Sequence, residues 1–253
     1  MKDRKPRTIC FFGFDEPDDG GRTWSLRTGL MQNDIAVMPC RTLVHGFFAK
    51  YRDLFRKWRD LSGEVDAIYV IFMGYYLMPL AWFLSRRRGI PVILDTLISQ
   101  YDTEVCDRKR LSRFSPRAWF LWLVDWVGCA LADALLVDTE EHKKFFAQQL
   151  HLPPRKIIVA PIGCRSDLFI PSEVAQPNDE FVVEFHGSFI PLQGIEYILD
   201  AAKILQDIQE AVRFEIIGIG QTFEMATNRA QELALTNVEF IGRKAPREIP
   251  HFV

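Results

Sequence analysis

Cysteine and histidine are too sparse, and too irregularly spaced, to build a covalent or metal-based framework. The five cysteines are odd in number and widely spaced, and no two of them form a C-x-x-C pair, so neither a disulfide scaffold nor a zinc knuckle is expected. His45, His151 and His251 lack partners at metal-ligand spacing. We therefore expect a cytoplasmic protein without a bound metal or cofactor.

Long apolar runs are also missing. The basic N-terminus, residues 1–7, leads into an apolar run over 8–14 that is too short for a signal peptide and is expected to form a strand. The most apolar stretch, 119–137, is interrupted by Asp125 and Asp133. Each carboxylate would cost roughly 3 kcal/mol near the centre of a bilayer, so a membrane-spanning helix is not expected.

The chain shows little net charge, since 31 Lys and Arg face 33 Asp and Glu, but the balance changes along the sequence. Residues 1–172 carry an excess of five positive charges, whereas residues 173–253 carry an excess of seven negative charges. A proline-containing stretch without apolar periodicity lies between the two parts. The sequence therefore predicts two domains, over 1–165 and 181–253, joined by a linker over 166–180.

Short apolar runs bounded by Gly, Pro and Asp alternate with longer amphipathic segments along the chain. This alternation predicts parallel strands with crossover helices, and hence an α/β fold with two Rossmann-like doubly wound lobes. The second lobe, with three strands, is expected to be incomplete. The predicted strands are 8–14, 35–38, 67–73, 92–95, 134–137, 157–160, 181–185, 213–217 and 238–241, and the predicted helices are 23–32, 47–61, 77–87, 116–131, 141–150, 195–208 and 223–235.

A strand, a loop with two glycines and a helix open the second lobe. The strand over 181–185 leads to Gly187, and Gly194 opens the amphipathic helix. The free backbone N–H groups of that helix start face the carboxyl end of the strand, which is the arrangement of an anion-binding site. A tight turn between strand and helix without any ligand is the alternative interpretation.

Several segments together resemble the group 1 (family 4) retaining glycosyltransferases, which have the GT-B fold. Residues 187–194, 216–221 and 237–243 resemble the nucleotide-binding domain of that family, residues 157–171 resemble its interdomain bridge, and residues 20–23 stand where it places a glycine-rich acceptor loop. The resemblance covers nearly the whole chain. It implies an enzyme that moves a sugar from a nucleotide sugar, used as a substrate, to a saccharide or lipid-linked acceptor.

The resemblance also implies which residues bind the donor. They are Gly187, Ser188, Gln193, Gly194, Gly218 and Gly220. In the family, an arginine follows the first loop glycine and a lysine precedes the second, and both hold the donor diphosphate. Ser188 and Gln193 replace these cations. Either backbone N–H groups and the helix dipole hold the phosphates, or the donor is not a standard nucleotide sugar.

The family's paired glutamates, eight positions apart, have no convincing counterpart. Glu224 and Glu232 show that spacing, but they lie on a predicted helix without the glycine-rich context, and we expect them to belong to a solvated helix face. The functional pair is expected beyond Val253. We therefore expect a C-terminally truncated member of the family, with little or no transferase activity by itself.

The segment 95–108 leaves a buried strand at its carboxyl end and is predicted to be a loop that lines the acceptor site. The predicted acceptor-binding residues are Gly20, Gly21, Arg22, Asp95, Ser99, Tyr101 and Asp102. They are assigned to acceptor positioning, and no catalytic nucleophile is assigned. In the alternative interpretation, Asp102 and Asp107 pair with Arg108 and Arg110 and only fix the loop.

Two histidines are candidates for polar helpers. His186 precedes the donor loop and is placed to polarise a hydroxyl or phosphate, although a structural hydrogen bond is the simpler role. His142 is expected in the first turn of a helix whose N-cap is Thr139, on the cleft side.

Basic and aromatic residues are interleaved over 47–59 and 108–126. This mixture suits the headgroup layer of an anionic membrane, so we predict peripheral attachment at the inner membrane face. Core-packed helices with a solvated basic side are the alternative. No nucleic-acid motif is present, and no nucleic-acid partner is expected. A second function class also stays open, namely a non-catalytic lobe that holds a sugar, a lipid headgroup or a partner.

Overall fold

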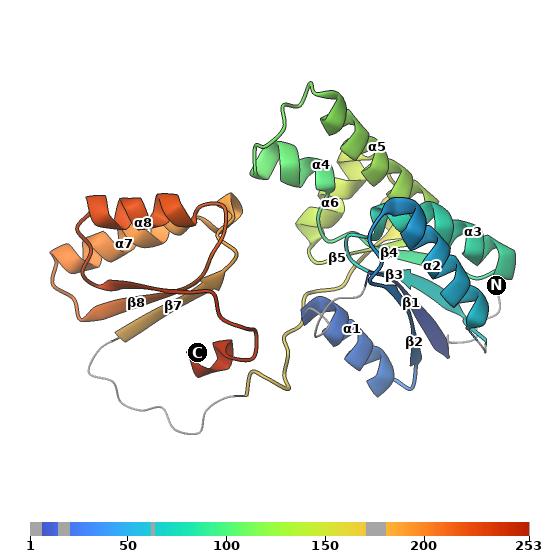
Figure 1. The fold of residues 1–253 in the computed structure, drawn as a ribbon, viewed down its shortest axis with the longest axis horizontal. Coiled ribbons are helices and arrows are strands. Elements are labelled where there is room, and N and C mark those ends of the chain that lie inside the picture. The colour runs from blue at the N-terminus through green and yellow to red at the C-terminus, as the bar shows by residue number, and fades with distance from the viewer. Residues whose placement is uncertain (1–6, 15–20, 62–63, 171–180, 253) are drawn as a thin grey trace. The chain divides into compact units, whose positions relative to one another are not determined.

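The computed structural model describes residues 7–14, 21–61, 64–170 and 181–252. The chain forms two compact units, Met1–Arg165 and Ser166–Val253, and each has its own parallel β-sheet (Figure 1). The predicted α/β fold class is therefore confirmed, with a smaller second sheet. Among the described residues, no helix has both the length and the apolar character needed to cross a bilayer.

The first unit contains a six-stranded sheet in the order β2-β1-β3-β4-β5-β6. All neighbouring strands are parallel. Its strands are β1 (Thr8–Phe14), β2 (Ala36–Thr42), β3 (Ala67–Val70), β4 (Val92–Asp95), β5 (Ala134–Val137) and β6 (Ile157–Val159), and its longer helices are α1 (Gly21–Gln32), α2 (Phe47–Asp60), α3 (Met78–Arg88), α5 (Pro116–Leu131) and α6 (Glu140–Gln149). The strand order reverses between β1 and β3. Doubly wound sheets bind ligands beside such a reversal, at the carboxyl ends of the strands.

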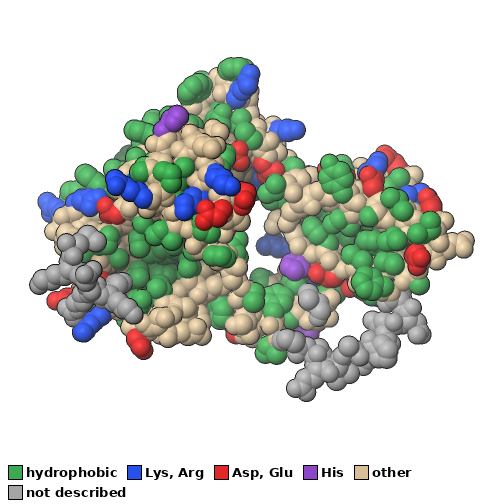
Figure 2. Space-filling model, turned by 180° about the vertical axis from the view of Figure 1, so that it is seen from behind, with side chains coloured by type: hydrophobic (Ala, Val, Ile, Leu, Met, Phe, Trp, Pro, Cys, Tyr) green, Lys and Arg blue, Asp and Glu red, His purple; other side chains and the backbone are tan. Residues whose placement is uncertain are grey.

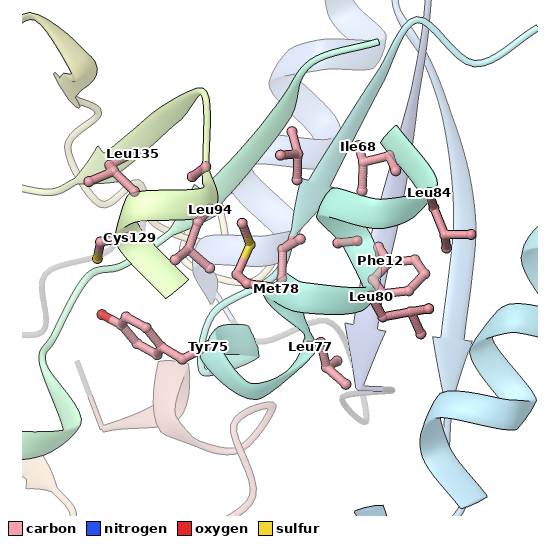
Figure 3. Packing of buried hydrophobic residues seen from close by; sticks show 14 of the residues in the cluster. Phe12, Ile68, Tyr75, Leu77, Met78, Leu80, Leu84, Leu94, Cys129 and Leu135 are labelled. Atoms are coloured by element: carbon pink, nitrogen blue, oxygen red, sulfur yellow. The ribbon is translucent and has the colours of Figure 1, made fainter. Parts of the chain in front are cut away.

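Both faces of this sheet are covered, as the apolar runs of the central strands require. Alternate residues of β1 point to opposite faces of the sheet. Phe12 belongs to a large core with residues of α2, α3, α5 and α6, whereas Phe11 belongs to a smaller core against α1. Figure 3 shows Leu80 and Leu84 of α3 beside Phe12 in the larger core. This packing fixes the carboxyl ends of β1, β3 and β4 side by side.

The second unit contains three parallel strands in the order β7-β8-β9. They are β7 (Phe181–Gly187), β8 (Val212–Gly218) and β9 (Val238–Gly242), with helices α7 (Ile195–Asp207) and α8 (Phe223–Glu232). Figure 1 shows both helices on the same face of the sheet. Their core contains Phe189, Leu199 and Ile216, all fully buried.

One prediction about local structure was wrong. The segment after β4 is not an open loop but forms a single α-helical turn, α4 (Gln100–Asp102), followed by a π-helical turn, η2 (Thr103–Asp107). The Ser99 hydroxyl caps this turn by accepting a hydrogen bond from the N–H of Asp102 at 3.0 Å. Further short 3-10 turns are η1 (Gly74–Leu77), η3 (Pro154–Lys156), η4 (Pro191–Gln193) and η5 (Ile249–His251).

Candidate functional site

A buried ion pair lies at the carboxyl end of the first sheet. Arg22 comes from the first turn of α1, and Asp95 is the last residue of β4. The guanidinium Nε of Arg22 lies 2.9 and 2.8 Å from the two carboxylate oxygens of Asp95, and both side chains are buried. Because breaking a buried pair leaves a charge without compensation, this contact holds α1 firmly against β4.

Other polar groups complete the pair. The Tyr69 hydroxyl donates to Asp95 Oδ2 at 2.6 Å, and Arg22 Nη1 donates to the carbonyl oxygen of Ala160 at 2.9 Å. Burial by itself would lower the pKa of Arg22, but the hydrogen bond and charge of Asp95 outweigh it, so the pKa is raised. In the described part of the chain, Arg22 Nη2 is buried without a hydrogen-bond partner. One donor of this guanidinium is therefore uncommitted.

The predicted acceptor residues at the carboxyl end of the first sheet differ in exposure and in hydrogen bonding. Gly21 is exposed at the start of α1, and Gly20 lies outside the described residues. Asp95 is fully buried and both of its oxygens accept hydrogen bonds from Arg22, so it orients the guanidinium, and its own contact with an acceptor stays a prediction. Arg22 is the member of the pair with a free donor, and its direct contact with an acceptor stays a prediction.

A second polar cluster fixes the turn after β4. The carboxylate Oδ2 of Asp125, in the middle of α5, accepts from the Ser99 hydroxyl at 2.7 Å and from the backbone N–H of Tyr101 at 3.0 Å. The side-chain amide of Gln100 approaches the other oxygen at 3.4 Å. Burial raises the pKa of Asp125 to about 6, although these hydrogen bonds oppose the shift. The cluster ties α4 to α5.

The remaining predicted acceptor residues differ in burial and in whether their side chains are already hydrogen-bonded. Ser99 is buried and committed to Asp125 and the helix cap, whereas Tyr101 and Asp102 are half-buried. The ion pairs that hold the following segment start from Glu104, which lies 3.8 Å from Arg108 and 3.5 Å from Arg110. The alternative interpretation expected these arginines to pair with aspartates, and it did not include Glu104.

Tyr69 and Asp125 were not predicted as site residues. Asp125 carried a usable signal, because an aspartate inside a strongly apolar helix must be hydrogen-bonded when it is buried. Tyr69 carried a weaker one, since a buried tyrosine in a central strand usually finds a partner for its hydroxyl. Neither signal names the partner, which comes from an element distant in sequence.

In the second unit, the loop after β7 is anchored to Thr222, the residue that precedes α8. Ser188 is exposed, and Phe189 is fully buried with a left-handed backbone, φ 47°. The carbonyl oxygen of Phe189 accepts from both the N–H and the hydroxyl of Thr222, at 2.8 and 2.9 Å. Phe189 thereby anchors the loop in the core and leaves Ser188 facing solvent.

Gln193 closes the loop. Its side-chain oxygen accepts from the backbone N–H of Ile190 at 3.3 Å, and a Cβ atom on Gly187 would lie only 2.7 Å from its amide nitrogen. Gly194, at φ 60°, ends η4 and begins α7, whose N-terminus has no side-chain cap. The N–H of Tyr197 donates to the carbonyl oxygen of Gly194 at 3.0 Å, so an anion would have to meet the earlier N–H groups of this turn, where Glu196 also places a negative charge.

Two glycines, one at the end of β8 and one just after it, are required by close packing. A Cβ atom on Gly218 would lie 1.9 Å from the carbonyl oxygen of Gly187, and one on Gly220 would lie 1.8 Å from that of Ser188. Only glycine permits this approach of the two loops. The structure thus supplies a packing reason for the predicted donor-binding glycines, and their contact with a donor stays a prediction.

The remaining candidates lie on the surface. His186 is exposed, and its Nδ1 lies 3.0 Å from a carboxylate oxygen of Glu184. His142 contacts Asp138 through Nδ1, and its backbone N–H donates to the Thr139 hydroxyl at 3.1 Å, which confirms Thr139 as the N-cap of α6. Both glutamates of the spaced pair, Glu224 and Glu232, lie exposed on α8, as expected for a solvated helix face.

Residues 167–253 match the family model of the glycosyl transferases group 1. No curated protein sequence matches the chain. The fold is similar to that of WaaG, a glycosyltransferase involved in lipopolysaccharide biosynthesis, with a TM-score of 0.59 and 9% identity over 97% of this chain and 71% of that one. It is also similar to UDP-GlcNAc 2-epimerase from Neisseria meningitidis bound to UDP-GlcNAc, with a TM-score of 0.55 and 12% identity over 96% and 74% of the two chains.

TarM from S. aureus, solved in complex with Fondaparinux, alpha-GlcNAc-glycerol and UDP, matches with a TM-score of 0.50 and 14% identity over 70% of this chain. This chain covers only 33% of TarM. At such identities the likeness concerns the fold alone, which is the two-unit architecture of the GT-B proteins. Because an epimerase and a glycosyltransferase both share it, the fold by itself does not specify the reaction.

Proposed function

Because residues 167–253 match the family model of the glycosyl transferases group 1, we propose that this chain is a retaining glycosyltransferase that moves a sugar from a nucleotide sugar to a saccharide or lipid-linked acceptor. The family match of the second unit carries this proposal, and the glycine-framed loop after β7 supports it. The proposed location is the cytoplasm, peripheral at the inner face of the membrane.

On the donor side, the proposed diphosphate site consists of the exposed Ser188 and the uncapped start of α7. As the bond between sugar and nucleoside diphosphate breaks, negative charge develops on the leaving group. Oriented backbone N–H groups stabilise such charge without moving during the reaction. Because Ser188 and Gln193 are neutral, these dipoles have to supply most of the stabilisation.

On the acceptor side, the proposed contact is Arg22, whose Nη2 is an unused donor beside the reversal of strand order. Asp95, Tyr69 and the carbonyl of Ala160 fix the guanidinium in one orientation. A positioned donor of this kind suits a hydroxyl or phosphate oxygen of an acceptor. No catalytic residue is assigned.

A non-catalytic binding lobe is the second candidate, and the neutral Ser188 and Gln193 favour it. A lobe that only holds a sugar or a lipid headgroup has no developing charge to stabilise. The two candidates differ in a simple assay. Purified protein is given nucleotide sugars and lipid-phosphate acceptors, and release of the nucleoside diphosphate is followed. We expect acceptor-dependent release that is slower than about 1 per second, an ordinary enzyme rate, whereas nucleotide binding without any such release would favour the binding lobe.

Donor binding is tested by calorimetry with UDP and GDP. Ser188→Asp places a negative charge where the phosphates are proposed to lie, and it should weaken binding at least tenfold, or about 1.4 kcal/mol. Asn228→Asp adds the same charge on the exposed side of α8 and should leave binding unchanged. Equal effects of the two substitutions, or no binding of either nucleotide by the unmodified protein, would contradict the proposed donor site.

A further inference from the structure

We infer that the first unit docks onto an anionic lipid bilayer through one continuous aromatic face, formed by the outer side of α5, by η1 and by the first turn of α2. This aromatic face consists of Phe47, Phe48, Tyr76, Trp119, Phe120 and Trp126. The inference rests on the proposed function, because a lipid-linked acceptor would require the enzyme to work at a membrane surface. It adds the residues that make the contact.

Helix α5 is apolar on both sides. One side packs into the unit through Ala118, Leu121 and Cys129, which are buried. The opposite side exposes Trp119 to 63% and also exposes Leu123 and Trp126. The spacing of Trp119, Leu123 and Trp126 places them in one stripe. Because a surface helix normally turns a polar side outward, an exposed stripe of this kind indicates a surface that something else covers.

The stripe continues beyond α5. The ring centroids of Phe120 and Tyr76, which lies in η1, are 6.4 Å apart. The backbone carbonyl of Tyr76 accepts a hydrogen bond from the hydroxyl of Tyr51. Tyr51 packs against Phe47 with ring centroids 4.6 Å apart, and Phe47 lies against Phe48, which is 85% exposed. Two segments that are far apart in the sequence thereby share one surface.

Positive charges border the aromatic residues. Exposed Lys109, Arg113 and Arg117 precede or begin α5. The guanidinium of Arg113 lies 4.6 Å from the ring centroid of Phe114, which is 74% exposed. Figure 2 shows hydrophobic and basic side chains next to one another at the tip of the first unit. Rings that insert beside headgroups and cations that meet lipid phosphates are the two components of binding to an anionic bilayer.

The charges also argue against a second copy of the chain as the occupant. In a symmetric dimer the same face would be present on both copies, so the cations around Arg113 and Arg117 would approach one another. A bilayer with acidic lipids has the opposite charge and needs no matching shape. The observations therefore favour lipid over self-association.

The test is sedimentation of the chain with phosphatidylcholine vesicles, with and without about one-third phosphatidylglycerol. We expect binding to the anionic vesicles, weak binding to neutral ones, and loss of binding between about 0.1 and 1 M salt, where the Debye length falls from roughly 10 to 3 Å. Trp119→Ser combined with Phe120→Ser should weaken binding at least tenfold. Arg113→Glu combined with Arg117→Glu should abolish the preference for anionic vesicles.

Matched controls exist on the same chain. Ile204→Ser with Ile208→Ser removes two equally exposed apolar side chains at the end of α7, and Lys144→Glu with Arg155→Glu reverses two exposed charges elsewhere on the first unit. Both should bind like the unmodified protein, and circular dichroism checks that all variants fold.

Equal loss of vesicle binding in controls and test variants would overturn the inference, as would a dimer in solution that Trp119→Ser with Phe120→Ser dissociates. Nucleotide calorimetry is a separate readout, so the donor proposal and the membrane inference can fail independently.

Discussion

Ser99 and Asp125 share a hydrogen bond of 2.7 Å in a place that solvent does not reach. The bond joins the turn that follows β4 to the middle of α5. It therefore connects the segment proposed to line the acceptor site with the helix proposed to touch the membrane. The same carboxylate also receives the N–H of Tyr101. Asp125 is thus the residue through which these two parts of the first unit are held together.

The first prediction concerns the pH dependence of stability. Because the folded state raises the pKa of Asp125 from 3.8 to about 6, folding favours the protonated carboxyl. Its stabilising contribution is complete below the unfolded pKa and is lost as pH rises through about 6, a loss of about 2 kcal/mol between roughly pH 4.5 and 7. Urea unfolding at both pH values, compared between the unmodified chain and Asp125→Asn, isolates this contribution. An unchanged pH dependence in Asp125→Asn would contradict the assignment.

The second prediction concerns the Arg22–Asp95 pair. Asp95→Asn removes the charge that compensates the buried guanidinium and should reduce the free energy of unfolding by about 3–5 kcal/mol. Arg22→Met combined with Asp95→Asn should cost less than the sum of the single changes, because the unpaired charge is then absent. Asp60→Asn, on the exposed end of α2, is the control for loss of a carboxylate and should have little effect. Additive single effects would show that the two residues are not coupled.

The third prediction separates close packing from backbone strain in the donor loop. Gly218 has φ 128° and no room for a Cβ, whereas Gly242 has φ 80° and open space around it. Gly242→Ala should therefore cost only the strain of a positive φ, about 1 kcal/mol. Gly218→Ala adds a collision with the carbonyl oxygen of Gly187 and should cost at least about 2 kcal/mol more. Thermal unfolding of the second unit measures both, and similar losses would argue against the contact.

The fourth prediction tests the missing cations. Ser188→Arg adds a charge at an exposed position and should tighten binding of a nucleoside diphosphate about tenfold or more, with a gain that falls as salt rises. Gln193→Lys should gain less, because lysine cannot accept the N–H of Ile190 that the glutamine oxygen now accepts. Calorimetry on the two single variants measures the difference. Weaker binding by Ser188→Arg would mean that the loop does not face a phosphate.

The helix over 116–131 shows why prediction from sequence succeeded for the elements. Its bounds were expected from a proline at the start and an apolar period, and the structure has α5 at the same residues. The segment after β4 was less predictable, because its α and π turns depend on Ser99 and Tyr101 reaching Asp125, which lies on another helix. Local periodicity cannot reveal a partner 24 or 26 residues away.

The sequence by itself determined the alternation of strands and helices, the α/β class and the glycine framework of the donor loop, because each follows from side-chain period or backbone sterics within a few residues. Only the tertiary structure decided that Asp95 forms an ion pair with Arg22, that Gly218 packs on the carbonyl of Gly187, and that Tyr76 joins two aromatic segments into one face. These contacts depend on which strands become neighbours and how closely loops approach. The chain fixes such relations only when all its elements pack together.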